Sequence, residues 1–218
     1  MPRSKAERRL PRSFYVRDAR EVAPELLHKV FVHGSRRGRI VEVEAYVGDG
    51  TDPGSHAHRG RTKRNATMFG PPGHLYVYFT YGMHWCCNAV CDPDGTASAV
   101  LLRAVEPLDG VAEMRAARPA ARRDVDLTNG PAKLCQAFDI TGIHDGVDLV
   151  RPPAGGIAIV DDGVDPPADP VITTRIGLSA GAELPWRWYV RGNAHVSHKV
   201  GGSATVNRPS RKAGAQHP

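Results

Sequence analysis

The stretch from residue 75 to 105 most narrows what this chain can fold into, because it reads as three extended segments joined by two turns. In the run LYVYF (75–79), alternate side chains would point to opposite faces of a strand. The Tyr-Gly pair at 81–82 can reverse the chain, and a second strand is expected from about 84 to 91. The Asp-Pro-Asp-Gly turn at 92–95 then leads into a third strand. The pattern predicts a meander of antiparallel strands.

Shorter elements surround this meander. A further strand is expected over 39–47, and the runs VITTRIGLS and PWRWYVRG indicate two late strands. Short helices are expected in DAREVAPELL, with Asp18 as a cap, in EPLDGVAEMRAAR, and in NGPAKLCQAF, with Pro131 in the first turn. We therefore expect the α+β class, with a single domain built on a mainly antiparallel, curved sheet and short peripheral helices.

The two ends differ from the middle of the chain. Residues 1–12 and 207–218 are polar, basic and poor in apolar side chains, so we expect both to be disordered around one domain over 13–206. The basic N-terminus is not followed by an apolar run, and no stretch approaches the ~18 apolar residues of a membrane span. We expect no signal peptide or membrane segment, no membrane partner, and a cytoplasmic protein, associated with the nucleoid if the source is bacterial.

Metal chemistry is not favoured by the cysteines and histidines. Along a strand Cys87 and Cys91 would lie about 13 Å apart, too far to share one metal ion. The histidines His56, His58 and His74 lack the spacing of a strong metal motif. We expect buried, packed cysteines and neither a metal nor another cofactor.

The run VEVEAYV (41–47) carries the first candidate for chemistry. In a regular strand its valines and Ala45 would share one face, and Glu42, Glu44 and Tyr46 the other. That second face is either a solvated surface or a site where a carboxylate does acid–base or nucleophilic work. Tyr46 favours the site, since an aromatic ring beside two carboxylates suggests that something flat is held there.

Charge and aromatic residues point to a polyanionic partner. The chain has 29 Lys and Arg against 23 Asp and Glu, a net charge of +6, which favours nucleic acid. Tyr81 falls at the reversal after the alternating run, where it either folds back over the hairpin or projects as a wedge into a base stack. Basic residues follow Tyr46 in the run HRGRTKR, and Arg187 and Arg191 alternate with tryptophans.

Taken together, these segments resemble the alkyladenine (3-methyladenine) DNA glycosylase family. The resemblance rests on GRIVEVEAYVG, SHAHRGRTKRNATMFGPPGHLYVYFTYGMHWCCN, AVLLRAVEPLDG, NGPAKLCQAF and WYVRG, which occur in the family's order. It implies a monofunctional glycosylase that flips damaged purines out of duplex DNA and starts base excision repair. The implied substrates are 3-methyladenine, other N-alkylpurines, and hypoxanthine or ethenoadenine as further candidates.

The resemblance also implies roles for individual residues. Glu44 would activate the water that attacks C1′ of the deoxyribose, with Arg103 beside that water. Asn88 would discriminate against the exocyclic amino group of guanine. The walls of the base pocket would be formed by Tyr46, His56, Tyr76 and Tyr78. Because the interval from Glu44 to the histidine is one residue longer than in the animal enzymes, His58 is an alternative to His56.

The DNA contacts implied in the same way lie outside the pocket. Tyr81, together with Met83, would intercalate and fill the gap left by the flipped nucleotide. From their basic side chains alone, Arg61, Arg64, Lys133 and Arg191 are candidates for contact with phosphate. The expected partner is double-stranded DNA with a damaged purine, bound by a monomer. None of the residues matched to the base pocket is a lysine, so no lyase step is expected.

Two other functions remain open from the residues alone. A non-catalytic DNA-binding protein could use the same basic face, although the set of Glu44, Tyr46, Tyr78 and Asn88 argues against it. A metal-dependent nuclease could be built from the loops rich in His and Asp.

Overall fold

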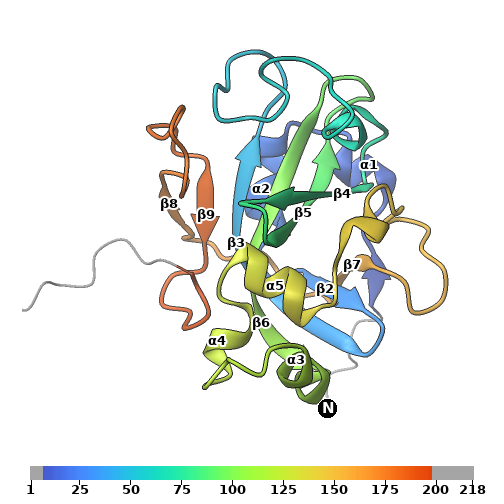
Figure 1. Ribbon diagram of the computed structural model, residues 1–218, viewed down its shortest axis with the longest axis vertical. Helices are drawn as coiled ribbons and strands as arrows, with labels where there is room; N and C mark the ends of the chain where they lie inside the picture. The colour runs from blue at the N-terminus through green and yellow to red at the C-terminus, as the bar shows by residue number, and fades with distance from the viewer. Residues whose placement is uncertain (1–6, 198–218) are drawn as a thin grey trace, which may run out of the picture.

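Strands β3 (Arg36–Tyr46) and β6 (Ser98–Asp109) form the long central pair of the structure, a computed structural model that describes residues 7–197. The other strands are β1 (Arg8–Arg9), β2 (Val30–His33), β4 (Leu75–Thr80), β5 (His84–Cys91), β7 (Ala158–Asp161), β8 (Val171–Thr173) and β9 (Arg187–Tyr189). The sheet order is β1-β7-β2-β3-β6-β5-β4, while β9 pairs with both β3 and β8. Every pairing between these strands is antiparallel, and the sheet curls around its own core (Figure 1).

The predicted meander is confirmed as β4, β5 and β6. Residues 81–83 reverse the chain between β4 and β5, and residues 92–97 join β5 to β6. The late strands are shorter than the sequence suggests, since β8 and β9 each contain three residues. A mainly antiparallel sheet with a few short helices is the α+β class, as expected.

Short helices and turns pack around the sheet, as Figure 1 shows. They are α1 (Arg12–Tyr15), α2 (Ala19–Leu26), α3 (Val111–Ala117), α4 (Val125–Thr128), α5 (Pro131–Ala137) and the 3-10 turns η1 (Ala66–Phe69) and η2 (Gly142–His144). The carboxylate of Asp18 accepts a hydrogen bond of 2.7 Å from the backbone N–H of Arg20 and so caps α2. Pro131 stands in the first turn of α5, where its missing N–H removes no helical bond.

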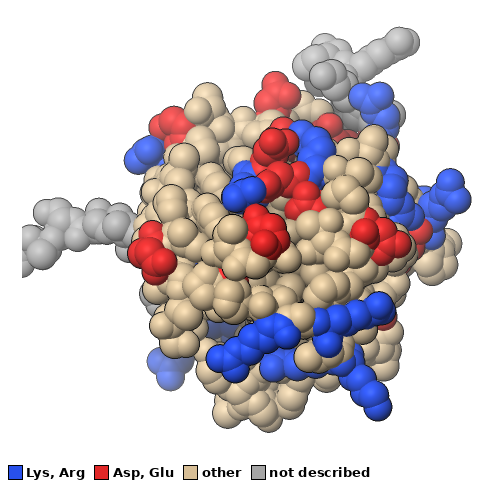
Figure 2. Space-filling view, turned by 90° about the horizontal axis from the view of Figure 1, so that it is seen from above, with Lys and Arg blue, Asp and Glu red and all other residues tan. Residues whose placement is uncertain are grey.

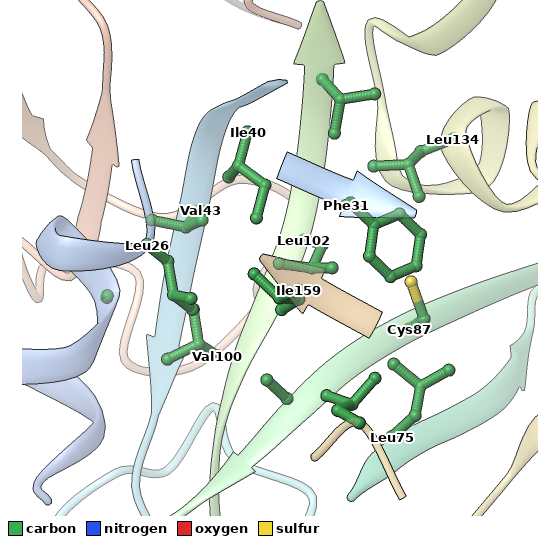
Figure 3. Close-up of a cluster of buried hydrophobic side chains, with 14 of the residues drawn as sticks. Leu26, Phe31, Ile40, Val43, Leu75, Cys87, Val100, Leu102, Leu134 and Ile159 are labelled. Carbon is green, nitrogen blue, oxygen red and sulfur yellow. The ribbon is translucent and has the colours of Figure 1, made fainter. Parts of the chain in front are cut away.

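The main hydrophobic core lies between the curled sheet and helices α2 and α5 (Figure 3). Phe31, Leu102 and Leu134 bring β2, β6 and α5 into this cluster, and Cys87 is buried beside them. All four cysteines are free and buried, which fits the packing role predicted for them. On the other face of β4, Tyr76 and Tyr78 belong to a second, smaller cluster.

The predicted alternation in β3 fails at Val41. The register between β3 and β6 shifts on both sides of Glu42, which marks a β-bulge. Ile40 and Val43 therefore both face the main core, whereas Val41 packs in a separate cluster with residues of β6 and β9. Glu42 is not solvated either, since it is fully buried.

The predicted disordered N-terminus is partly ordered. Within residues 1–12, β1 pairs with β7, Leu10 is buried and α1 begins at Arg12. The predicted tail 207–218 lies outside the described residues, as do 1–6. Across the part that is described, no helix is both long and apolar enough to cross a bilayer.

Candidate active site

Glu44, near the end of β3, is fully buried and held by three donors. The hydroxyl of Tyr46 and Nη1 of Arg103 donate to its Oε2 at 2.8 and 3.1 Å. The backbone N–H of Ile176 donates to Oε1 at 2.8 Å. These donors come from β3, from β6 and from the segment between β8 and β9, so three parts of the fold fix one carboxylate. Glu44 and Tyr46 lie on the same side of β3, as the alternation predicts.

The guanidinium of Arg103 joins both acidic side chains of β3. Its Nε donates to Oε1 of Glu42 at 3.0 Å, while Nη1 contacts Glu44. Nε of Arg187, on β9, donates to the same Glu42 oxygen at 2.7 Å. Burial alone would raise the pKa of Glu42, but the charges of Arg103 and Arg187 and the bonds from Ser197 hold that pKa below its usual value. Glu42 is therefore an ionised, buried carboxylate.

The ring of Tyr46 packs against a second buried ion pair, formed by Arg175 and Asp52. The guanidinium carbon of Arg175 lies 4.6 Å from the centre of the Tyr46 ring. The same guanidinium donates to both carboxylate oxygens of Asp52 at 2.6 and 2.7 Å and to the carbonyl of Ala45 at 3.0 Å. Burial, and then the charge of Glu44, raise the pKa of Tyr46 well above its ordinary value, so its hydroxyl stays a donor.

An aromatic pocket lies between β4, β5 and the loop after β3, and Tyr46 links it to Glu44. Its lining residues are Tyr46, Gly54, His56, Met68, Tyr76, Tyr78, Asn88 and Leu178. The rings of Tyr76 and Tyr78 lie 5.4 Å apart at an angle of 30°, and the His56 ring stands edge-on to Tyr78 at 4.6 Å. The structure thus brings together all five residues that the sequence assigned to a base pocket.

His56, rather than His58, is among the residues that line the pocket and the wider hollow, although both histidines are exposed. Nδ1 of His56 lies 3.0 Å from the hydroxyl of Tyr76. Partial desolvation, and the charge of nearby Arg64, lower the pKa of His56, which favours its neutral form. Asn88 is buried and donates 3.1 Å to the carbonyl of Tyr76.

A wider hollow connects the pocket with the tip of the β4–β5 hairpin. It shares Tyr46, His56, Tyr78 and Leu178 with the pocket and adds Thr80, Tyr81, Cys86, Leu101, Arg103, Pro131, Ile176 and Gly177. At the hairpin tip, Tyr81 is 77% exposed and Met83 is 67% exposed. Tyr81 therefore does not fold back over the hairpin, which was one of the two possibilities from the sequence.

The basic side chains near the cleft differ in how strongly they are engaged. Seen from above, one band of Lys and Arg runs along the lower edge of the view, and other Lys and Arg side chains stand beside Asp and Glu elsewhere on this face (Figure 2). Arg61 is exposed, while Arg64 donates to the carbonyl of Phe79 and lies 5.6 Å from the centre of the Tyr78 ring. Two predicted phosphate contacts have protein partners, since Lys133 donates to Asn129 and Arg191 to Asp169.

Sequence reasoning missed the residues that complete the site from a distance. Asp52, Arg175, Ile176 and Leu178 occupy stretches without a local motif, and Asp52 and Arg175 meet across 123 positions. The only local signal was that the loop after β3, which contains Asp52, is long and rich in polar residues. Among residues 7–197, no group of three or more His, Cys, Asp or Glu side chains is placed to hold a metal ion.

A buried carboxylate that is hydrogen-bonded to Tyr46, one wall of an aromatic pocket, forms a candidate enzyme site suited to a flat ring. The sequence matches the family model "Methylpurine-DNA glycosylase (MPG)" over residues 13–194, and the chain belongs to this family. As a DNA glycosylase it is a DNA-binding repair enzyme that hydrolyses N-glycosidic bonds.

Relatives in bacteria agree with this family. A protein of Burkholderia lata is 61% identical over 192 residues, covering 88% of this chain and 92% of the relative. One of Streptomyces avermitilis is 46% identical over 193 residues, with 86% and 90% covered, and one of Carboxydothermus hydrogenoformans is 47% identical over 196 residues, with 87% and 99% covered. All three carry the name "Putative 3-methyladenine DNA glycosylase".

Proposed function

We propose that this chain is a monofunctional glycosylase that flips damaged purines out of duplex DNA and hydrolyses the N-glycosidic bond with a water activated by Glu44. The observation that carries the proposal is the placement of one fully buried carboxylate, fixed by three donors, next to an aromatic pocket. The substrates are 3-methyladenine and other N-alkylpurines, and the reaction starts base excision repair.

Glu44 suits this reaction because the transition state carries positive charge on the sugar. Hydrolysis of an N-glycosidic bond passes through an oxocarbenium-like state, which a nearby carboxylate stabilises while it takes a proton from water. The donors Tyr46, Arg103 and the N–H of Ile176 keep the carboxylate in one orientation. Arg103 also borders the wider hollow, where the attacking water would lie.

The pocket selects purines that are flat and electron-poor. An N-alkylated purine carries a positive charge and is attracted to the faces of tyrosine rings such as Tyr46 and Tyr78. A neutral His56 adds a hydrogen-bonding group without repelling that cation. Such a base needs no acid to depart. Hypoxanthine and ethenoadenine are neutral, need a proton and are expected to leave more slowly.

Asn88 discriminates against normal guanine in the pocket. Its side chain is buried and its amide is oriented by a bond to the carbonyl of Tyr76. The exocyclic amino group of guanine would have to displace this contact or remain unpaired, and an unpaired buried polar group costs about 1–3 kcal/mol. This cost holds back normal guanine, which is a poor leaving group, whereas 7-methylguanine is already cationic and departs despite it.

The exposed hairpin tip supports base flipping. Extruding a base costs a few kcal/mol of stacking, which a side chain inserted into the gap offsets. Tyr81 is the wedge in this proposal, and Met83 contacts the adjoining stack. Arg61 contacts phosphate directly, while Arg64, Lys133 and Arg191 exchange their present partners for phosphate. The enzyme binds DNA as a monomer.

The reaction stops at the abasic site. A lyase step needs an amine that forms a Schiff base with the sugar. None of the residues that line the pocket or the wider hollow is a lysine.

Incubation with a panel of damaged duplexes tests the proposal, scoring free base and strand breaks separately with and without chelator. The proposal expects release of 3-methyladenine and 7-methylguanine, insensitivity to chelator and intact strands until alkali is added. Tight binding without base release would favour a non-catalytic DNA-binding protein. Chelator-sensitive nicks would favour a metal-dependent nuclease.

A further inference from the structure

Glu42 is as deeply buried as Glu44 but has no assigned role. Both oxygens of its carboxylate are used. Oε1 accepts from Arg103 at 3.0 Å, from Arg187 at 2.7 Å and from the hydroxyl of Ser197 at 2.9 Å. Oε2 accepts 2.7 Å from the backbone N–H of Ser197. Burying a charge is costly unless it is paired, so this carboxylate is tolerated only because strands β6 and β9 bring two cations to it.

Arg103 is divided between the two carboxylates. It gives Nε to Glu42 and only Nη1 to Glu44, although a guanidinium can bind one carboxylate with two parallel bonds. Arg103 thereby meets Glu44 through a single bond, to Oε2 alone. The third nitrogen, Nη2, lies 3.4 Å from the hydroxyl oxygen of Ser197, so Nε and Nη2 are both engaged away from Glu44.

Other polar groups also face this pair of carboxylates. From β3 comes Tyr46, from β5 the thiol of Cys86, from β9 Arg187 and from the chain after β9 Ser197. Burial raises the pKa of Cys86 to about 11, so this thiol adds no charge near neutral pH. Within the described chain, the charges in contact with Glu44 and Glu42 are then those of Arg103 and Arg187.

We propose that Glu42 is a positioning residue that holds Arg103 in its single contact with Glu44 and, through its own negative charge, keeps Glu44 basic enough to activate water. Glu42 itself touches neither the substrate nor the water. The inference rests on the proposed role of Glu44 as general base.

Removing the charge of Glu42 acts on Glu44 in a defined direction. A neighbouring negative charge makes it harder for a carboxylate to lose its proton. Without that charge, and with Arg103 released to bind it more fully, the carboxylate of Glu44 would take a proton from water less readily. Removing Arg187 should have the opposite effect on Glu44. Glu42 would then attract Arg103 more strongly, and Arg103 would bind Glu44 less.

The test is the pH dependence of single-turnover base release from duplex DNA carrying 7-methylguanine, a cationic base that needs no acid. For Glu42→Gln we expect the midpoint of the acid limb to move down by roughly one pH unit and the plateau rate to fall about tenfold. For Arg187→Gln the midpoint moves up. Active-site titration corrects each rate for the folded fraction.

A matched control is Asp162→Asn, which breaks a structural ion pair with Arg39 away from the cleft. Its midpoint should equal that of the wild type. If Glu42 only supports folding, Glu42→Gln will lower the active fraction with an unmoved midpoint, which overturns the inference. If Glu42→Gln does not fold, the upward shift in Arg187→Gln still decides, and an unmoved midpoint there overturns the inference as well.

Failure of the inference differs from failure of the proposed function. If wild-type protein releases base and Glu44→Gln does not, the proposed function stands whatever Glu42→Gln does. If Glu44→Gln retains full activity, the general base is another group and Glu42 has nothing to position.

Discussion

The hydroxyl of Tyr46 donates a hydrogen bond of 2.8 Å to the carboxylate of Glu44, two positions earlier on the same strand. One side chain thus belongs both to the wall of the aromatic pocket and to the support of the buried carboxylate. The pocket wall and the proposed base occupy alternate positions of β3, so our proposal places a ring bound against Tyr46 beside Glu44.

Replacing this tyrosine by phenylalanine separates its two roles. Tyr46→Phe keeps the ring but removes a donor that favours the ionised carboxylate, so the acid limb of base release should move to higher pH. The rate at pH 6 should fall more than the rate at pH 8, with lesion affinity little changed. Single-turnover excision across that range checks this. Tyr15→Phe, which removes a buried hydroxyl without a partner, is the control and should leave the profile unchanged.

Tyr81 carries backbone strain at an exposed position. Its φ is +51°, and the following Gly82 also has a positive φ of +66°. Asparagine tolerates this conformation better than tyrosine or alanine. The free energy of unfolding should therefore be about 1 kcal/mol larger for Tyr81→Asn than for Tyr81→Ala. Both variants should lose roughly tenfold or more in excision, because neither can fill the gap in the stack. Equal stability of the two variants, or wild-type excision by either, would contradict this account.

The buried ion pair of Asp52 and Arg175 should contribute more to the free energy of unfolding than the exposed ion pairs do. Both side chains are fully buried, so Asp52→Asn leaves a guanidinium without its counter-ion. The expected loss is about 3–5 kcal/mol, measured by denaturant unfolding. Glu25→Gln breaks a half-exposed pair with Arg17 and should cost below about 1 kcal/mol. Comparable losses in the two variants would show that burial does not set the energy of these pairs.

Local chemistry made much of the fold predictable. The meander, the cap at Asp18 and Pro131 at the start of α5 all rest on neighbouring residues, where period-two alternation and turn residues act directly. The bulge at Glu42 escaped prediction because one extra residue shifts the alternation without any marker in the sequence. The order in the first twelve residues escaped too, since β1 is held by β7, far away in the chain.

The residues of the candidate site likewise fall into a group that the sequence predicted and a group that it did not. Glu44, Tyr46, Tyr78 and Asn88 lie on regular strands, and the family resemblance located them as lining or flanking one pocket. Asp52 and Arg175 form their pair between two loops, and neither residue type is unusual in a loop. Long-range partners of this kind follow from the closed fold and not from local periodicity.

Release of base by Glu44→Gln tests the central claim most directly. The substrate is duplex DNA with 7-methylguanine or 3-methyladenine, and Glu113→Gln, an exposed carboxylate on α3, is the control. The account predicts that Glu44→Gln binds the lesion as the wild type does but releases base at least about a hundredfold more slowly, while Glu113→Gln is unchanged. Base release by Glu44→Gln at the wild-type rate would contradict it.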